Sequence, residues 1–324
     1  AISRDEQALN AINVTLDSMQ RGGIYDWVGG GFSRYSVDAD WFAPHFEKML
    51  YDNAQLLSLY ADTYKITQNS NYKNCIKETI NFLNTELKHE NSGYYSALDA
   101  DSEGEEGLFY TWTYNDLKSV LNDKEFEIAR DFFGLRSTGN WENGRNILSQ
   151  NLSFEAIADQ FEMTPLKISS ILSKIKNKLK NTRKKRQKPG LDNKLITAHN
   201  AMLVKGFINA YQALTNEDYK TMALELLESL IKNSINDGHA VNRLMDKSKP
   251  QGFLDDYAFF IEALILSYEI SLEVKYLEIA QNLIAYCLIN FYDKKQQLFY
   301  YTEQSTKLVA RKIEFSDNVI PSSN

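Results

Sequence analysis

The stretch LITAHNAMLVKGFINAYQALTNEDYKTMALELLESLIK, residues 195–232, contains the pattern on which the fold prediction depends. Its first part, 195–214, is apolar almost all round, which is typical of a helix that is buried on every side. A short polar turn follows, and the helix predicted after it, 217–234, is far more charged. A buried helix, a tight turn and an outer helix together predict one helical hairpin.

Two tyrosines spaced by eight bracket this turn, and the spacing recurs. The three pairs are Tyr64 and Tyr72, Tyr211 and Tyr219, and Tyr268 and Tyr276. The last two pairs are 57 residues apart and the first two 147, so one divergent unit fits the larger gap, with helices at 114–133 and 165–184. A period of roughly 50 residues with two helices per unit predicts an array of helical hairpins.

Short β-like stretches follow the predicted outer helices: GYYSALDA (93–100), HAVNRLMD (239–246) and QLFYYTEQ (297–304). In a ring of hairpins, insertions at this position decorate one rim. Because the first helix of each pair is apolar all round, a closed ring with an inner layer suits the sequence better than an open solenoid. We therefore predict an all-α fold, an α/α toroid of helical hairpins with small β-hairpin insertions at one rim.

The composition is ordinary for a globular chain: 324 residues, of which 43% are apolar and 24% charged. No run of about 18 apolar residues occurs, so we expect no membrane partner. The net charge of −7 argues against nucleic acid as a partner. Cys75 and Cys287 are isolated, which predicts buried thiols in a reducing compartment and a cytoplasmic location. The chain begins AISRDEQALN, without an initiator Met, and we expect it to be a piece of a longer protein.

Four blocks, in order, resemble the signature blocks of the YyaL family, also called the spermatogenesis-associated protein 20 family. They are GGIYDWVGGGFSRYSVDADWFAPHFEKMLYDNA (22–54), LDADSEGEEGLFYTW (98–112), DNKLITAHNAML (192–203) and FLDDYAF (253–259). The resemblance implies a six-hairpin, glycosidase-like toroid similar to N-acylglucosamine 2-epimerases. It also implies a thioredoxin-like domain in the full-length protein, which this chain lacks. Residues 1–324 would then form one partial toroid domain of about four hairpins, and whether the ring closes stays open.

The first block combines glycines with aromatic residues. Its five clustered glycines let the backbone turn tightly and approach a neighbour or ligand closely. Tyr25, Trp27 and Tyr35 are then candidates for the walls of a substrate pocket, and Arg34 is a candidate donor beside them. The alternative is an irregular loop that packs its aromatic side chains onto the ring.

His45 is the leading candidate for acid–base chemistry. The stretch 44–64 predicts an inner helix with Pro44 in its first turn, and Lys48 and Asp52 would share a face with His45. An imidazole at the open rim of a toroid can act as general acid or base, with Asp52 contributing to substrate binding. The alternative is a structural histidine at a helix start.

The second block contains five carboxylates within eight residues, but as a calcium loop it fails because its twelfth position is Tyr110. Asp99 and Asp101 flank an alanine in a strand-like stretch, so they would project to one face. They are the preferred candidates, Asp101 as a catalytic and Asp99 as a binding residue. For Glu105 and Glu106 we favour a solvated acidic turn.

The fourth block starts the most apolar helix with two carboxylates, one of which is expected to cap that helix. The other, taken as Asp256, can face the centre of the ring and form a glycosidase pair with Asp101. Tyr257 beside it is a candidate substrate-binding residue. The third block adds His199 and Asn200 as binding candidates. There the chain departs from the family pattern, in which Trp usually precedes the Asn, and Ser33 stands where the family commonly has His. Both departures count against a two-histidine mechanism of the epimerase type.

The basic run KIKNKLKNTRKKRQKPG (174–190) mimics part of a helix-turn-helix. Because the chain as a whole is acidic and resembles the family above, we favour an outer helix with a solvated face that leads into a Pro-Gly loop, and not a DNA-binding helix. Arg183 and Arg186 are expected to pair with the acidic second block.

The leading hypothesis is a carbohydrate-type binding or processing pocket that uses His45, Asp101 and Asp256, without metal or organic cofactor. Whether the chain is an enzyme stays open. The alternative is a non-catalytic scaffold that works with the thioredoxin-like domain. Catalysis predicts that the three residues converge on one cavity, whereas a scaffold predicts that they are dispersed or locked in capping bonds.

Overall fold

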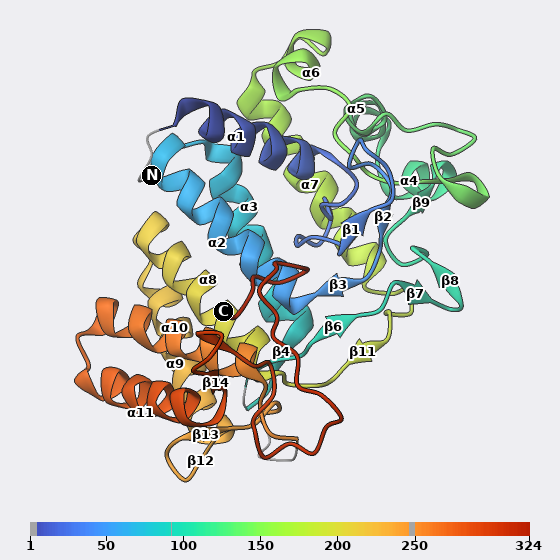
Figure 1. The fold of residues 1–324 in the computed structure, drawn as a ribbon. Helices are drawn as coiled ribbons and strands as arrows, with labels where there is room; N and C mark the ends of the chain where they lie inside the picture. Colours follow the sequence, from blue (N-terminus) through green and yellow to red (C-terminus); the bar gives the residue numbers. More distant parts are fainter. Residues whose placement is uncertain (1–4, 92, 246–249) are drawn as a thin grey trace. The chain divides into compact units, whose positions relative to one another are not determined.

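A computed structural model describes residues 5–91, 93–245 and 250–324 (Figure 1). The chain divides into two compact units. Unit 1 comprises Ala1–Lys48 and Leu98–Leu191, and unit 2 comprises Met49–Ala97 and Asp192–Asn324. The chain passes from one unit to the other at three two-residue strands: β3 (Lys48–Met49), β6 (Ala97–Leu98) and β11 (Leu191–Asp192).

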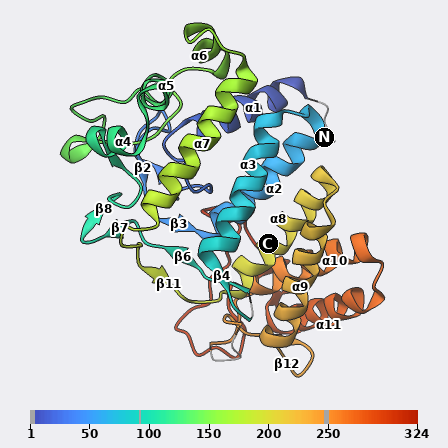
Figure 2. The same cartoon turned by 180° about the vertical axis from the view of Figure 1, so that it is seen from behind.

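Unit 2 consists mainly of three helical hairpins. They are α2 (Leu50–Thr67) with α3 (Ser70–Phe82), α8 (Thr197–Leu214) with α9 (Glu217–Ser234), and α10 (Leu254–Ser271) with α11 (Val274–Asn290). The apolar helix α8 packs between α2 and α10, and each of these three helices also packs against the second helix of its own hairpin (Figures 1 and 2). The predicted alternation of inner and outer helices is confirmed.

The spacing of eight between paired tyrosines has a backbone explanation. In each hairpin the inner helix ends at a residue with left-handed backbone, Gln68, Thr215 or Leu272. The N–H of that residue donates to the carbonyl of the first tyrosine, and the N–H of the second tyrosine donates to the residue that precedes the outer helix. The second tyrosine of each pair is buried, so it anchors the first turn of the outer helix. One turn geometry is therefore used three times.

A two-residue antiparallel hairpin follows each outer helix of unit 2. These are β4 (Lys88–His89) with β5 (Gly93–Tyr94), β12 (Ile235–Asn236) with β13 (Ala240–Val241), and β14 (Tyr292–Asp293) with β15 (Leu298–Phe299). A π-helical turn η1 (Leu83–Leu87) connects α3 to the first of them. The predicted β insertions are confirmed at all three positions.

Unit 1 is built around α7 (Pro165–Arg183), against which three shorter helices pack: α4 (Tyr114–Val120), α5 (Asp123–Phe133) and α6 (Phe154–Gln160). It also contains α1 (Glu6–Arg21), a 3₁₀ turn η2 (Glu142–Gly144) and three strand pairs. The pairs are β1 (Tyr35–Ser36) with β2 (Pro44–His45), β7 (Asp101–Ser102) with β8 (Glu105–Glu106), and β9 (Trp112–Thr113) with β10 (Arg145–Asn146). Across the described residues, no helix is both long and apolar enough to cross a membrane.

The prediction of one helix over 114–133 is wrong, because two capped helices occupy that range. Thr113 caps α4 and Asn122 caps α5, each in a capping box with the acidic residue three positions later. The chain therefore breaks at Leu121, and the divergent unit has no pair of long helices.

The prediction that an inner helix begins at Pro44 is also wrong, since α2 begins at Leu50. Burial alternates strictly along 44–50, with every second residue buried, and this is the period of a strand. Phe46, Met49 and Leu50 also fit a helical stripe, so the short apolar run was ambiguous. His45, Lys48 and Asp52 consequently do not share one helix face.

Candidate functional site

His45 of unit 1 lies on β2 within a group of charged side chains. Its Nδ1 lies 2.7 Å from Oε1 of Glu106, and its Nε2 lies 3.7 Å from Oε2 of Glu47. An ionised carboxylate can only accept hydrogen bonds, so Nδ1–H donates to Glu106, and Nε2 is the ring nitrogen that remains for proton exchange. The imidazole is partly exposed, at 28% of its side-chain surface. It is thus an oriented acid–base group that solvent can reach.

Two predicted binding residues surround this imidazole. Tyr35 pairs with His45 between β1 and β2, and the two rings stack with their centroids 5.1 Å apart. The guanidinium of Arg34 donates to Oε2 of Glu47 at 2.8 Å, and the Arg34 N–H donates to the Glu47 carbonyl. Glu47 therefore links Arg34 to His45.

The acidic second block approaches His45 through Glu106, the residue for which the sequence favoured a solvated turn. In the β7–β8 hairpin Asp101 is the register partner of Glu106. Asp99 and Asp101 are both exposed, with buried Ala100 between them. Sequence reasoning missed Glu106 because only the hairpin register brings it to a histidine 61 residues away.

Beneath this surface Asp26 is buried between two cations. Arg183 donates to both carboxylate oxygens of Asp26, and Lys48 Nζ donates to Asp26 at 2.8 Å and to the Gly30 carbonyl at 2.9 Å. Burial by itself would raise the pKa of Asp26, but Arg183 and Lys48 hold that pKa far below its ordinary value. Lys48 is therefore part of a buried ion cluster, not a companion of His45 on a helix.

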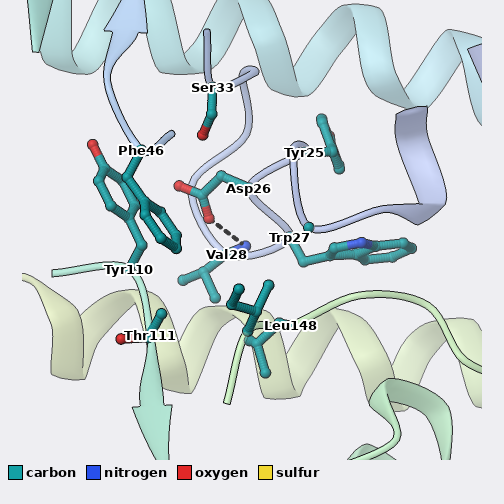
Figure 3. Close-up of a pocket in the computed structure, with 11 residues that line it drawn as sticks. Tyr25, Asp26, Trp27, Val28, Ser33, Phe46, Tyr110, Thr111 and Leu148 are labelled. Carbon is teal, nitrogen blue, oxygen red and sulfur yellow. Dashed lines mark hydrogen bonds between the residues drawn. The ribbon is translucent and has the colours of Figure 1, made fainter. Parts of the chain in front are cut away.

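The glycine-rich loop encloses a small cavity that Tyr25, Asp26, Trp27, Ser33 and Tyr110 help to line (Figure 3). Its volume is about 20 Å³, enough for one water molecule and too small for a sugar ring. Tyr25 and Trp27 are buried and meet edge-to-face at 6.0 Å. These two aromatic side chains therefore pack within the fold, which is the alternative that the sequence left open. The cavity beside them is too small for them to form the walls of a substrate pocket.

In unit 2, His199 lies in the first turn of α8. It is 7% exposed, and its Nδ1 has no hydrogen-bond partner among the described residues. Burial, and then the charge of Arg243, lower the pKa of His199 to about 3. The ring is thus neutral at physiological pH, which removes it as a general acid there and further disfavours a two-histidine mechanism.

Asn200, next to His199 in the sequence, stabilises a β-hairpin. Its side-chain amide donates to the Tyr94 carbonyl at 3.0 Å, and its Oδ1 accepts from the Tyr94 N–H at 2.8 Å. Because Asn200 is fully buried, it holds the β4–β5 hairpin and presents no group to a substrate.

Asp255 and Asp256 share one guanidinium. Arg243 Nη1 lies 2.8 Å from Asp255 and 3.1 Å from Asp256. Asp256 also accepts from the N–H groups of Ala198 and Phe253, at the starts of α8 and α10. Burial and the charge of Asp255 raise the pKa of Asp256 to about 7.

These bonds correct two expectations. The N-cap of α10 is Phe253, and neither aspartate occupies that position. Asp256 is completely buried in unit 2, whereas Asp101 is exposed in unit 1, so the bonded, inaccessible carboxyl of Asp256 does not suit the proposed glycosidase pair. Tyr257 is likewise buried, and its hydroxyl accepts from the Val241 N–H at 2.9 Å. Asp52 lies half-buried in the first turn of α2, and its binding role stays a prediction.

The basic run 174–190 is tied into unit 1. Lys178 pairs with Glu125 at 2.6 Å, and Arg183 binds Asp26. Arg186 donates to three carbonyls of residues 108–111 and lies 3.8 Å from the Trp112 ring centroid. Arg186 therefore binds the second block, as expected, but through backbone carbonyls and the Trp112 ring and not through the acidic side chains, whereas Arg183 pairs with Asp26 of the glycine-rich loop. No group of three or more His, Cys, Asp or Glu residues within the described ranges is placed to hold a metal ion.

No protein-family model matches the chain. Among curated proteins, the uncharacterised protein B0495.5 of Caenorhabditis elegans is 30% identical over 98% of this chain and 48% of its own length. Spermatogenesis-associated protein 20 is 33% identical in Mus musculus and 32% in Homo sapiens, each over 83% of this chain and 38% or 39% of its own length. The chain thus spans less than half the length of these relatives.

Solved structures with a similar fold include two glycoside-degrading enzymes. A family 76 glycoside hydrolase from a bovine Bacteroides thetaiotaomicron strain has a TM-score of 0.57 at 12% identity, over 96% of this chain and 49% of that chain. An unsaturated glucuronyl hydrolase from Bacillus sp. GL1 has a TM-score of 0.52 at 12% identity, over 90% of this chain and 59% of that chain. The neighbours are α/α toroids, so the predicted fold class is confirmed. The sequence relatives place the chain in the spermatogenesis-associated protein 20 family.

Proposed function

We propose that the surface around His45 in unit 1 binds a carbohydrate-type ligand and transfers protons to or from it. The observation that carries the proposal is the 2.7 Å bond from His45 Nδ1–H to Glu106, which orients the imidazole and leaves Nε2 for proton exchange with a ligand. His45 is the proposed general base or acid, and Glu106 is its positioning residue.

The neighbouring side chains suit a polyhydroxyl ligand. Glu47 and Asp101 supply carboxylate acceptors for hydroxyl groups, and Arg34 supplies donors. Tyr35 is 49% exposed and adds an aromatic surface beside the imidazole. Fold similarity to sugar-processing enzymes agrees with this chemistry, although a fold alone is a weak argument for function.

The test is ligand binding by isothermal titration calorimetry, with neutral, acidic and amino monosaccharides and disaccharides. We expect His45→Gln and Glu106→Gln to weaken binding of the ligand that the wild type recognises, by tenfold or more. His239→Gln is the matched control, because His239 is an exposed histidine of unit 2. Equal binding by wild type and His45→Gln would place the ligand elsewhere.

A second candidate is the non-catalytic scaffold that works with a thioredoxin-like domain. The contacts of Asp255 and Asp256 favour this candidate. Both carboxylates bind Arg243, and Asp256 also accepts from the Ala198 N–H at the start of α8, so they are occupied by structural bonds. This candidate predicts that no sugar binds and that a full-length protein retains its cellular activity with His45→Gln. A cytoplasmic location belongs to both candidates, in keeping with the buried thiols of Cys75 and Cys287.

A further inference from the structure

We propose that unit 2 contains a second small-molecule site, between the β4–β5 hairpin and α9, which takes a compact polyhydroxyl ligand bearing an ammonium group. An amino sugar is the simplest molecule of this class. The site is independent of the His45 surface, which belongs to unit 1.

A cavity of about 180 Å³ lies at this place, nine times the volume of the cavity beside Asp26. One wall is the face of α9 formed by Met222, Glu225, Leu226 and Ser229, which have the i, i+3, i+4, i+7 spacing of neighbours along a helix. The opposite wall is the hairpin, including Tyr94. The cavity is therefore bounded by the helix α9 on one side and by the two paired strands with described residues of their turn on the other.

The apolar floor of the cavity is held rigidly. The Tyr94 hydroxyl donates to Asn84 Oδ1 at 2.7 Å, and the Tyr94 backbone is bound on both sides by Asn200. Gly93 has a φ of +121°, and a Cβ there would lie 2.9 Å from Asn200 Oδ1, so the hairpin approaches α8 as only glycine allows. Tyr94 and Leu226 are both buried and form an apolar surface that suits the C–H face of a ring.

The polar rim sets the charge of the ligand. Glu90 and Glu225 contribute two negative charges and Lys88 one positive charge. His89 accepts a hydrogen bond at its Nδ1 from the Asn91 N–H at 3.1 Å. The lining is thus net negative, which favours a cationic ligand.

The rim also supplies hydrogen bonds for hydroxyl groups. Ser229 Oγ accepts from Asn233 at 3.1 Å and keeps its own proton for a ligand. The carboxylate of Glu225, one turn earlier on the same face, accepts from hydroxyl or ammonium groups. Within the described ranges no metal-binding group of carboxylates and histidines is present, so an organic cation fits better than a metal ion.

The experiment is calorimetric titration of the chain with D-glucosamine and, as its neutral match, D-glucose. We expect D-glucosamine to bind at least tenfold more tightly than D-glucose. Glu225→Gln should remove most of this difference, and Ser229→Trp, which fills the cavity, should abolish binding of both. Glu217→Gln, at the start of the same helix and outside the lining, is the control and should change nothing.

Each other result overturns the proposal. No binding by a folded wild type, equal binding of the two sugars, or binding that survives Ser229→Trp would each contradict it. If Ser229→Trp fails to fold, the test rests on Glu225→Gln: a preference for D-glucosamine that this variant retains in full contradicts the proposal. Retained binding in His45→Gln separates this site from the one proposed in unit 1.

Discussion

Arg183 donates from its two terminal nitrogens to the two carboxylate oxygens of Asp26, at 2.9 and 2.8 Å, although 157 residues separate them. Both side chains are almost fully enclosed, at 8% exposure each. The bond joins the glycine-rich loop of unit 1 to the end of α7, and Lys48 completes the cluster. The glycine-rich loop is thus held in place by a buried ion cluster.

Arg183→Leu should lower the free energy of unfolding by about 3 kcal/mol, because removing one partner of a buried pair leaves a charge incompletely compensated. Urea denaturation followed by circular dichroism measures this loss. Lys184→Met, at the exposed next residue, is the matched control and should stay within about 0.5 kcal/mol of the wild type. A loss below about 1 kcal/mol for Arg183→Leu would mean that Lys48 alone satisfies Asp26.

Gly29→Ala should destabilise the protein through the same cluster. A Cβ at Gly29 would collide with the Arg183 guanidinium and lie 2.8 Å from Asp26 Oδ2, while the backbone of Gly29 does not require glycine. We expect a loss of about 2 kcal/mol in the wild type and a much smaller one in the Arg183→Leu background. Gly190→Ala, which meets only ordinary contacts, serves as the control. Additive losses in the double variant would show that the two residues act separately.

His199 should make stability depend on pH. Its pKa is lowered to about 3 in the folded protein and is about 6.5 in an unfolded chain, so the unfolded state takes up the proton first. The free energy of unfolding is therefore unaffected by His199 above about pH 6.5, and it decreases as pH falls from 6.5 towards 3, because protonation of His199 then favours the unfolded state. Between pH 7 and pH 5 the wild type should lose about 2 kcal/mol more than His199→Leu. Parallel pH profiles from urea denaturation would contradict the burial of a neutral ring.

The fold was predictable where a single sequence pattern determines the local structure. Apolar helices with no polar face, followed by tyrosines spaced by eight, predicted the three hairpins of unit 2. Contacts between the hairpins follow the same repeat. Asn209 donates to Asp62, 147 residues earlier, and Lys205 pairs with Glu262, 57 residues later. These separations equal the spacings of the tyrosine pairs.

The site was less predictable because its contacts depend on tertiary structure. The run from Pro44 to Leu50 satisfies both a helical and an alternating pattern. The strands β2 and β3 form in it because they pair with β1 and β6, which are distant in the sequence from at least part of the run. Glu106 reaches His45 through the register of a two-residue hairpin. Asp256 was correctly expected near a helix start. Nothing in the neighbouring sequence, however, indicated that it would be the third residue of α10 or that it would bind Arg243.

The hairpin turns of unit 2 offer a last test of the fold. Thr215 ends α8 with a φ of +50°, which a β-branched residue adopts only with strain, and glycine adopts freely. Thr215→Gly should therefore raise the free energy of unfolding, by up to about 1 kcal/mol after the greater freedom of the unfolded chain is subtracted. Thr63→Gly, in the interior of α2, is the control and should lower it, since glycine weakens a helix and the buried side chain is lost. If urea denaturation shows that Thr215→Gly destabilises the protein, the strain of threonine at this left-handed position costs less than the freedom that glycine adds to the unfolded chain.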